Sequence, residues 1–451
     1  MKPSNDALRL VYMSRVLLFL VTLAAFVAVP AAARAAPTWS APVSVPGVIG
    51  QAVPVAVTPS GAAVLLAQVG RDALGSTGAA SKVVPLGADG QPGTPQPVSL
   101  AAGLLTTYAK GHIAAAGSTL VDGTITERSH ATVAVGTPSK LGPARGLTGS
   151  TGQHVFGLAG NLRGDLAVVT GDAAHVRTVY VRRAGTTTFK VALRIPVGSR
   201  ARGATVALGP KGDVLVVWED NHAIFARHLG ATGHAGAVHR IGDGVQSELQ
   251  AAIDDNGRLE VAWKTQRVSE GESITPAIVR LATAAPGHGF GPQRTVETVG
   301  ASGTARSVSA PAVRLVPEGG TRALLAWTGF ENGHFVVRAT DVVDGHRGVA
   351  QTLSPVSEDS VLGDASARAD GAAIIAWRSG VQGADPVPGQ SPTVFASHRD
   401  PGASAFGAPE QVSLAGENVL TAPFAALDPV SGRSFVAYSL LSGGVWVRAR
   451  P

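Results

Sequence analysis

The amino-acid sequence predicts an all-β fold, a β-propeller built from four-stranded antiparallel blades. Three observations lead to this fold class: a composition rich in turn formers, a glycine–aromatic spacing that recurs along the chain, and strands that are apolar at successive positions. Of the 451 residues, 56 are Gly, 29 are Pro and only 15% are charged. Few charges and many turn formers favour short strands over long, salt-bridged helices.

A turn glycine precedes an aromatic residue by six positions in four copies of the repeat: Gly212 and Trp218, Gly257 and Trp263, Gly371 and Trp377, Gly432 and Tyr438. Gly320 leads to Trp327 with one extra residue. Weaker copies without the aromatic are Gly61 to Ala67, Gly111 to Gly117 and Gly164 to Thr170. The eight copies lie roughly 45 to 60 residues apart, a spacing typical of propeller blades. Eight blades are therefore expected, with seven as the alternative because the Gly111 copy is degenerate.

Each copy contains four short apolar segments, and the second one distinguishes a propeller from a sandwich. Residues 324–327 and 373–377 are apolar at every position. Successive side chains of a strand point to opposite faces, so such a strand has both faces buried. A sandwich sheet with one wet face should alternate instead. A blade packed between two neighbouring blades fits the pattern.

The two ends of the chain predict how the ring closes. The last copy, residues 424–450, has only three strands, whereas residues 39–45 near the start resemble the fourth-strand segment 406–409. The N-terminal strand is therefore expected to complete the C-terminal blade and to remove an exposed sheet edge.

With these repeats the chain resembles the secreted bacterial β-propeller proteins built on a D-x-x-G-x-hydrophobic-x-x-x-W repeat. The stretch Asp254-Asp255-Asn256-Gly257 followed by Trp263 shows the repeat most clearly. The resemblance covers most of residues 37–451 and implies a fold, whereas function must come from a site. Sialidases are a more distant comparison, in architecture only. Arg194-Ile195-Pro196 is similar to their Arg-Ile-Pro element, but their Ser/Thr-x-Asp-x-Gly-x-Thr-Trp box is not reproduced.

Residues 1–36 are expected to be a signal peptide, and residues 37–451 a single propeller domain. Arg9 and Arg15 precede the apolar run 16–29, and small residues follow, which predicts cleavage near Ala35 or Ala36 and secretion. A run of about 14 apolar residues is short for a membrane span, so no stable anchor is expected. Translation from Met13 in place of Met1 would give a more compact signal.

Composition excludes several classes of function. The chain has no Cys, which rules out disulfides, a thiol nucleophile and thiolate metal sites. Its net charge of +6 falls to +3 without residues 1–35, and no dense basic cluster with aromatics predicts a nucleic-acid partner. The expected state is a monomer without a cofactor.

Several patterns that could carry chemistry are better explained as structure. The Asp-rich turns at 254–257, 370–371 and 428–432 fit tight turns, and none matches an EF-hand loop. Arginines recur in the third strands and are expected to form a belt of structural contacts, since repeats reproduce structural positions first: Arg182, Arg227, Arg280, Arg338 and Arg448. His222, His228, His234 and His239 lack the spacing of a metal site. No metal ligand and no catalytic residue is therefore assigned.

Loop length gives the most informative functional signal. The distance along the chain from the aromatic to the third-strand arginine measures the length of each loop. It is 9 residues after Trp218 and 17 after Trp263, and Trp377 lies 20 residues before Ser397, which occupies the equivalent position. These loops lie on the face opposite the glycine turns, so one face is uniform and the other varied. Varied loops on a rigid scaffold are where binding usually occurs. Candidate ligand-binding residues in these loops are Glu219, Asp220, Lys264, Arg267, Glu331 and Arg378.

The sequence favours a non-enzymatic binding or scaffolding module for a glycan, a cell-envelope component or a protein. The alternative is a hydrolase or lyase acting on polysaccharide. It would need two or more convergent carboxylates from different blades, among Glu219, Asp220, Glu270, Glu272 and Glu331.

Overall fold

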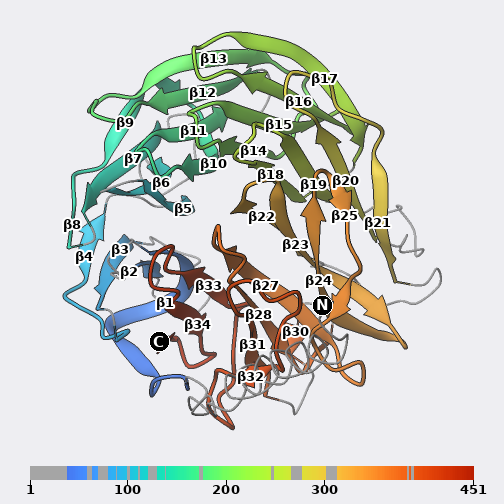
Figure 1. Ribbon diagram of the computed structural model, residues 1–451. Coiled ribbons are helices and arrows are strands. Elements are labelled where there is room, and N and C mark those ends of the chain that lie inside the picture. Colours follow the sequence, from blue (N-terminus) through green and yellow to red (C-terminus); the bar gives the residue numbers. More distant parts are fainter. Residues whose placement is uncertain are drawn as a thin grey trace, which may run out of the picture. The chain divides into compact units, whose positions relative to one another are not determined.

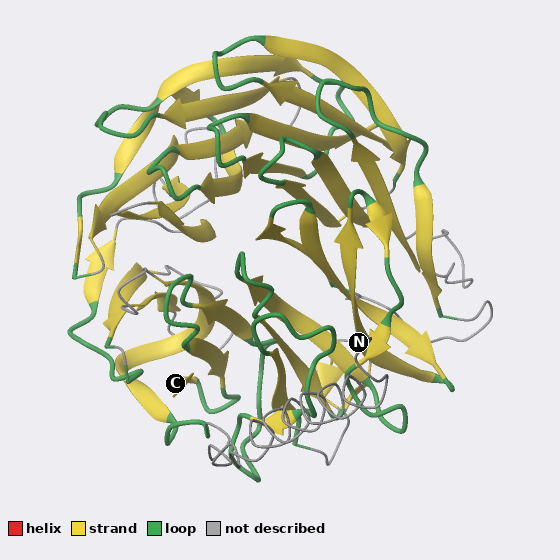
Figure 2. Ribbon diagram, viewed as in Figure 1, coloured by secondary structure: helices red, strands yellow, loops and turns green. Residues whose placement is uncertain are grey.

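The computed structural model describes residues 38–451 except 58–62, 70–79, 88, 99–101, 110–111, 120–129, 138, 172–175, 245–247, 266–276, 301–311, 383–384 and 387–390. Within these residues the chain folds into strands and connecting loops alone, as Figure 2 shows. No helix able to cross a membrane occurs in this described part. Residues Trp39 to Pro451 form one compact unit.

The strands are arranged in eight antiparallel blades, which confirms the predicted fold class and blade count (Figure 1). Blade 1 holds the second half of β1 (Val43–Val57), with β2 (Ala63–Val69), β3 (Ala80–Leu86) and β4 (Gln96–Val98). Blade 2 holds β5 (Ala102–Ala109), β6 (His112–Thr119), β7 (His130–Thr137), β8 (Lys140–Leu141) and β9 (Arg145–Thr151). Blade 3 holds β10 (His154–Gly160), β11 (Leu166–Gly171), β12 (Val176–Arg182) and β13 (Lys190–Pro196). Blade 4 holds β14 (Ala204–Leu208), β15 (Val214–Asp220), β16 (Ala223–Leu229) and β17 (Ala235–Asp243).

The remaining blades follow the same order. Blade 5 holds β18 (Glu248–Ile253), β19 (Leu259–Thr265), β20 (Ala277–Ala284) and β21 (Arg294–Val299). Blade 6 holds β22 (Val313–Gly319), β23 (Arg322–Glu331), β24 (His334–Val343), β25 (His346–Arg347) and β26 (Gln351–Thr352). Blade 7 holds β27 (Ser360–Ala367), β28 (Ala373–Ser379), β31 (Thr393–Arg399) and β32 (Glu410–Gln411), and the small hairpin of β29 (Val381–Gln382) and β30 (Asp385–Pro386) lies between β28 and β31. Blade 8 holds β33 (Phe424–Leu427), β34 (Ser434–Ser439) and β35 (Gly444–Arg450).

The first strands of neighbouring blades contact one another around a closed cycle. β1 contacts β5, β5 contacts β10, and the series continues through β14, β18, β22, β27 and β33 back to β1. The first strand of each blade is therefore the inner one, and the fourth lies at the rim of the ring. Because strands alternate in direction, the turns between first and second strands lie on one face, here called the turn face. The second-to-third-strand connections and the links between blades lie on the other, here called the loop face.

The first half of β1 completes blade 8, as the two chain ends predict. Val43 pairs with Val447, and Ser44 pairs with Trp446. The backbone N–H of Ser40 donates to the Ala449 carbonyl at 2.8 Å, and the Arg448 Nε donates to the Ser40 carbonyl at 2.6 Å. One continuous strand thus belongs to the last blade and to the first, and Figure 1 shows β1 beside β33 and β34.

The repeat aromatics lie in the seams between blades. Trp263 packs with the apolar residues of blade 4, and Trp327 packs with those of blade 5. Both indoles are fully buried, as are Trp377 and Tyr438. The second strands are buried along their whole apolar length, because each blade face is covered by a neighbour. The prediction that these runs form inter-blade seams is confirmed.

Candidate ligand-binding face

Five of the six predicted site residues lie at or near the ends of second strands on the loop face. Glu219 and Asp220 are the last two residues of β15, and Glu331 is the last residue of β23. The expectation that they occupy loops is wrong, because the second strands continue past the aromatic. The turns that follow have only two residues, Asn221-His222 and Asn332-Gly333, all with positive φ. This conformation matches the twist of a hairpin, so pairing continues to the end of the strand.

Lys264 and Arg378 also lie in second strands and are largely buried. Lys264, in β19, has 7% of its surface exposed, and Arg378, in β28, has 4%. An Nη1 of Arg378 donates to the Leu420 carbonyl, which places this arginine against the link between blades 7 and 8. Arg267, Glu270 and Glu272 lie outside the described residues.

A pocket of about 250 Å³, here called the inner pocket, lies where the first strands of blades 5 to 8 begin. Gly363 of β27 allows the close approach that forms one wall, since a Cβ there would overlap the Pro423 carbonyl oxygen. The pocket combines charged and apolar side chains from four blades. Its lining residues are Glu248, Lys264, Ala312, Arg314, Val361, Leu362, Gly363, Ala422, Pro423 and Phe424.

Arg314 connects three blades at this pocket. Its Nη1 contacts Glu248 Oε1 of blade 5 at 2.5 Å, and its Nε contacts Asp364 Oδ1 of blade 7 at 3.1 Å. Glu248 Oε2 also accepts the Val313 N–H at 3.3 Å, and Asp364 Oδ2 accepts the Ala425 N–H of blade 8 at 3.3 Å. Burial alone would lower the pKa of Arg314, but the Glu248 and Asp364 carboxylates raise it. The guanidinium is therefore permanently charged and held in place.

Lys264 is the second cation of the inner pocket. It is directly opposite Glu248 in the β18–β19 ladder. Its ammonium group makes no hydrogen bond or ion pair with any residue that the structure describes. Burial lowers the pKa of Lys264, and the charge of Glu248 opposes that shift only in part. A partly desolvated ammonium facing a pocket is a group that gains from an anionic partner.

A second hollow, here called the blade 4 hollow, has a volume of about 380 Å³. It lies between the link from blade 3 to blade 4 and the β15–β16 turn. Asp220 braces this link, because its Oδ2 accepts the Gly198 N–H at 2.7 Å. The lining residues are Ser199, Arg200, Ala201, Arg202, Glu219 and His222. Two exposed arginines, Arg200 and Arg202, thus line this hollow together with one buried acid, Glu219.

The acidic side chains described on the loop face accept hydrogen bonds from arginine side chains, a hydroxyl group and backbone N–H groups. Glu331 Oε2 contacts Arg338 Nη2 at 2.7 Å, and it accepts the Thr352 hydroxyl at 3.3 Å. Glu248, Asp364 and Asp220 are engaged as described above. Among the described residues, the structure therefore brings Glu248 and Asp364 together around Arg314. Glu219 and Asp220 lie in blade 4, and Glu331 contacts a different arginine, Arg338.

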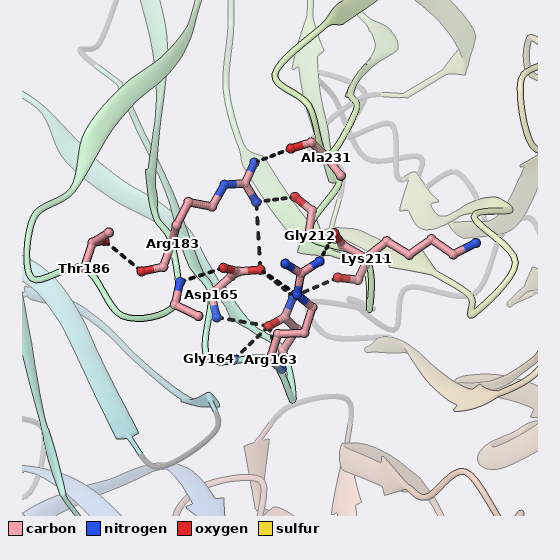
Figure 3. Close-up of polar contacts among 11 residues, drawn as sticks. Arg163, Gly164, Asp165, Arg183, Thr186, Lys211, Gly212 and Ala231 are labelled. Atoms are coloured by element: carbon pink, nitrogen blue, oxygen red, sulfur yellow. Dashed lines mark hydrogen bonds and ion pairs between the residues drawn. The ribbon is translucent and has the colours of Figure 1, made fainter.

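Short polar contacts join neighbouring blades on the turn face. Figure 3 shows the contact between blades 3 and 4, where Arg183 reaches the Gly212 and Ala231 carbonyls and approaches Asp165 Oδ2 to 3.9 Å. Arg163 donates to the Lys211 carbonyl, while the Lys211 amine points away from the cluster. In blade 5, Asp254 Oδ1 accepts the Asn256 and Arg258 N–H groups. Asp255 Oδ2 accepts the Gly320 N–H of blade 6 at 2.6 Å. These acids hold turns, as predicted.

The recurring third-strand arginines for which the structure gives contacts bind groups within the ring. Arg182 and Arg227 donate through Nε to the Thr186 and Gly236 carbonyls of their own blades. Arg338 contacts Glu297 of blade 5 at 3.0 Å.

The histidines do not converge: His222 lies at the β15–β16 turn, whereas His228 contacts Asp213 at 3.3 Å near the opposite end of the same hairpin. Within the described residues no group of three or more potential ligands could hold a metal ion.

Sequence reasoning missed Glu248, Arg314 and Asp364, which lie on inner strands. A signal was present, because Arg314 and Asp364 are charged residues at equivalent positions of two first strands. Arg314 pairs with Ala326, one position before the aromatic, and Asp364 pairs with Ala376 at the equivalent place. Arg200 and Arg202 were missed because they lie in a link between blades. These links differ too much in length and sequence for their residues to be aligned from one repeat to the next.

Comparisons with known proteins reveal similarity of fold alone. The WD40 domain of SCAP from fission yeast matches with 8% identity and a TM-score of 0.47, over 91% of this chain and 98% of that one. A polysaccharide lyase described as an ulvan lyase matches with 11% identity and a TM-score of 0.45, over 74% and 92%. A protein of unknown function from Dyadobacter fermentans matches with 13% identity and a TM-score of 0.40, over 68% and 99%. No family model matches the chain. No curated protein matches it either. By its topology the chain is an eight-bladed β-propeller.

Proposed function

We propose that this propeller is a non-enzymatic binding module that holds a glycan on its loop face. The alternative ligands for the same kind of module are another cell-envelope component and a protein. The N-terminal leader predicted from the sequence supports the proposal, because export is the step that would bring the module to such ligands.

The observation that carries the proposal is the inner pocket. Its walls come from the inner strands of four blades, and Arg314 ties three of them together through Glu248 and Asp364. A polar pocket on rigid strands loses little conformational entropy when a ligand binds. Small polar pockets with a few fixed hydrogen-bonding groups suit recognition of a ligand by orientation.

The same contacts argue against the hydrolase or lyase alternative. A general acid or base needs a carboxyl group that is open to substrate and matched to a partner carboxylate. Glu248, Asp364 and Glu331 are already held by arginines, and Asp220 is held by a backbone N–H. An arginine that donates to a carboxylate occupies the oxygens that would exchange a proton with a substrate.

A panel of glycans and polysaccharides, scored for both binding and cleavage on the purified protein without its leader, tests the proposal. Binding without turnover is expected. Cleavage of any polymer would overturn it, and binding of proteins in the absence of any glycan binding would move the ligand to another class.

A matched pair of variants locates the binding face. Lys264→Met changes the inner pocket, and Lys211→Met removes an exposed lysine on the turn face. We expect only the first change to weaken glycan binding. Equal effects of the two would show that general positive charge, and not the loop face, holds the ligand.

A further inference from the structure

Resting on the proposed function, we propose that the inner pocket binds the carboxylate of a uronic acid residue and that the ligand is an acidic polysaccharide. Three features of the described residues carry this inference: two cations with unused donors, acids that disfavour a doubly charged ligand, and an apolar wall beside the charges.

The unused donors belong to Lys264 and Arg314. Arg314 directs Nε to Asp364 and Nη1 to Glu248 and the Val313 carbonyl, while its Nη2 has no partner among the described residues. The Lys264 ammonium likewise has none there. Both side chains line the same pocket of about 250 Å³. A ligand oxygen placed between them would receive charge-assisted hydrogen bonds, which are about twice as strong as neutral ones.

The charge balance selects a singly charged ligand. Lys264 and Arg314 carry two positive charges, and Glu248 and Asp364 carry two negative ones, so the pocket as a whole is close to neutral. A phosphate monoester, with up to two negative charges, would be repelled by the two carboxylates. A carboxylate brings one charge and presents it in a plane that an arginine N–H edge matches.

The remaining wall of the pocket suits the ring of a sugar. Leu362, Pro423 and Phe424 lie beside the charged residues, and Phe424 is only half-buried. The C–H face of a pyranose ring can pack on such a surface while its carboxylate reaches the cations. Leu362 and Pro423 are already buried, so the surface that a sugar ring can cover belongs mainly to Phe424, and a free inorganic anion would leave it in contact with water.

The blade 4 hollow favours a polymer over a single sugar. Arg200 and Arg202 line it, both exposed, and it opens on the loop face as the inner pocket does. A polyuronate carries a carboxylate on every residue, so one chain can occupy the inner pocket and extend toward these arginines. Binding at two places on one chain raises overall affinity without any new type of contact.

Titration calorimetry with oligogalacturonate, neutral dextran oligomers and poly-glutamate tests the inference on the leader-free protein. We expect oligogalacturonate to bind and dextran not to. Lys264→Met should weaken oligogalacturonate binding by about 10- to 100-fold, the effect of losing one charged hydrogen bond. The same variant should lose binding of monomeric galacturonate, followed by saturation-transfer NMR.

A second variant separates the two hollows. Arg200→Gln combined with Arg202→Gln should weaken the oligomer and leave monomeric galacturonate unchanged. Lys264→Met keeps the Arg314 contacts with Glu248 and Asp364, so it is expected to fold, and thermal unfolding verifies this. Protection of Lys264 from reductive methylation by galacturonate gives a readout in the unaltered protein.

Each other outcome overturns the inference. Binding of neutral glycans in preference to oligogalacturonate would leave the proposed function standing and remove the uronate. Tighter binding of poly-glutamate than of oligogalacturonate would make the ligand an acidic peptide. Oligogalacturonate binding that Lys264→Met leaves unchanged would place the site elsewhere. Failure of every glycan in the panel to bind would overturn the proposed function itself.

Discussion

Glu260 of β19 is a buried acid at a position where neighbouring blades have apolar residues. The equivalent residues are Leu215, Leu324 and Ile374. Only 1% of the Glu260 surface is exposed, and neither carboxylate oxygen has a hydrogen-bond partner among the described residues. Burial raises the pKa of Glu260 to about 8, Asp254 adds to the shift and Arg258 opposes it. The side chain is therefore neutral at pH 7.

This acid makes the stability of the ring depend on pH. The pKa of Glu260 is about 8 in the folded chain and 4.5 without burial. The folded state therefore holds the proton more tightly between these values, and stability falls as pH rises through them, by about 1.4 kcal/mol per pH unit. Glu260→Gln, which cannot ionise, should remove this slope and unfold at a higher temperature than the parent protein at pH 9.

Thermal unfolding followed from pH 5 to pH 9 measures this effect. Asp400→Asn removes the same charge from an exposed position and serves as the control, for which an unchanged slope is expected. A Glu260→Gln variant with the slope of the parent protein would show that the carboxyl group is already ionised in the folded chain.

At the scale of the elements, the repeat aromatics do more than fill the seams. The Trp263 indole N–H donates to the Asp243 carbonyl on the outer strand of blade 4 at 2.9 Å. The Trp327 indole donates to Glu297 Oε2 on the outer strand of blade 5 at 2.6 Å. Tyr438 donates its hydroxyl to Glu417 Oε2 at 3.1 Å. The two indole bonds join a second strand to the outer strand of the preceding blade, and the Tyr438 bond joins one to the link between blades 7 and 8. These three aromatics therefore fix the register between blades as well as burying apolar area, whereas the Trp377 indole N–H has no partner among the described residues.

Glu297 shows how much one such contact contributes. It accepts bonds from Trp327, from the Phe330 N–H at 2.9 Å and from Arg338 Nη1 at 3.0 Å. Glu297→Ala leaves three donors without their acceptor, and unsatisfied buried donors cost about 1–3 kcal/mol each. We expect a large fall in the midpoint of thermal unfolding.

Glu331→Ala is the matched control, because Glu331 contacts the same Arg338 from a more exposed position. Exposed ion pairs contribute about 0–1 kcal/mol, so its midpoint should change little. Equal shifts for the two variants would contradict a special role for the seam.

At the scale of the whole molecule, the closing strand is the element on which the ring depends. Residues 37–46 include Val45, which is buried, and the Ser40 contacts with Arg448 and Ala449. Replacing them with a flexible Gly/Ser sequence should lower the unfolding midpoint and expose the β35 edge to rapid amide exchange. Unchanged stability and exchange would mean that blade 8 does not need its fourth strand.

The sequence predicted the architecture because the repeats carry it locally. Six residues from turn glycine to aromatic specify one turn and one buried strand, and repetition specifies the ring. Even the two-residue turn at Asn332-Gly333 has a known local signature. The fourth-strand likeness between residues 39–45 and 406–409 was sufficient to predict the closure.

The inner pocket could not be predicted in the same way. Arg314 contacts Glu248 and Asp364, which lie 66 and 50 positions away in different blades. No spacing rule links them, because the links between blades vary in length. Lys264 was selected as a loop residue, whereas the structure places it in β19. Only the meeting of four inner strands turns these separate charges into one pocket.

The shared strand β1 also has a consequence for the order in which the molecule forms. Val43 pairs with Val447, so the contact joins residues about 400 positions apart, whereas every other blade pairs strands that are near neighbours in sequence. Local hairpins form quickly, and distant pairings must wait until the intervening chain is ordered. Closure is therefore expected as the last step of folding. Until it occurs, both blade 8 and the lead half of β1 present unpaired backbone, the state in which a newly made chain is most exposed to aggregation.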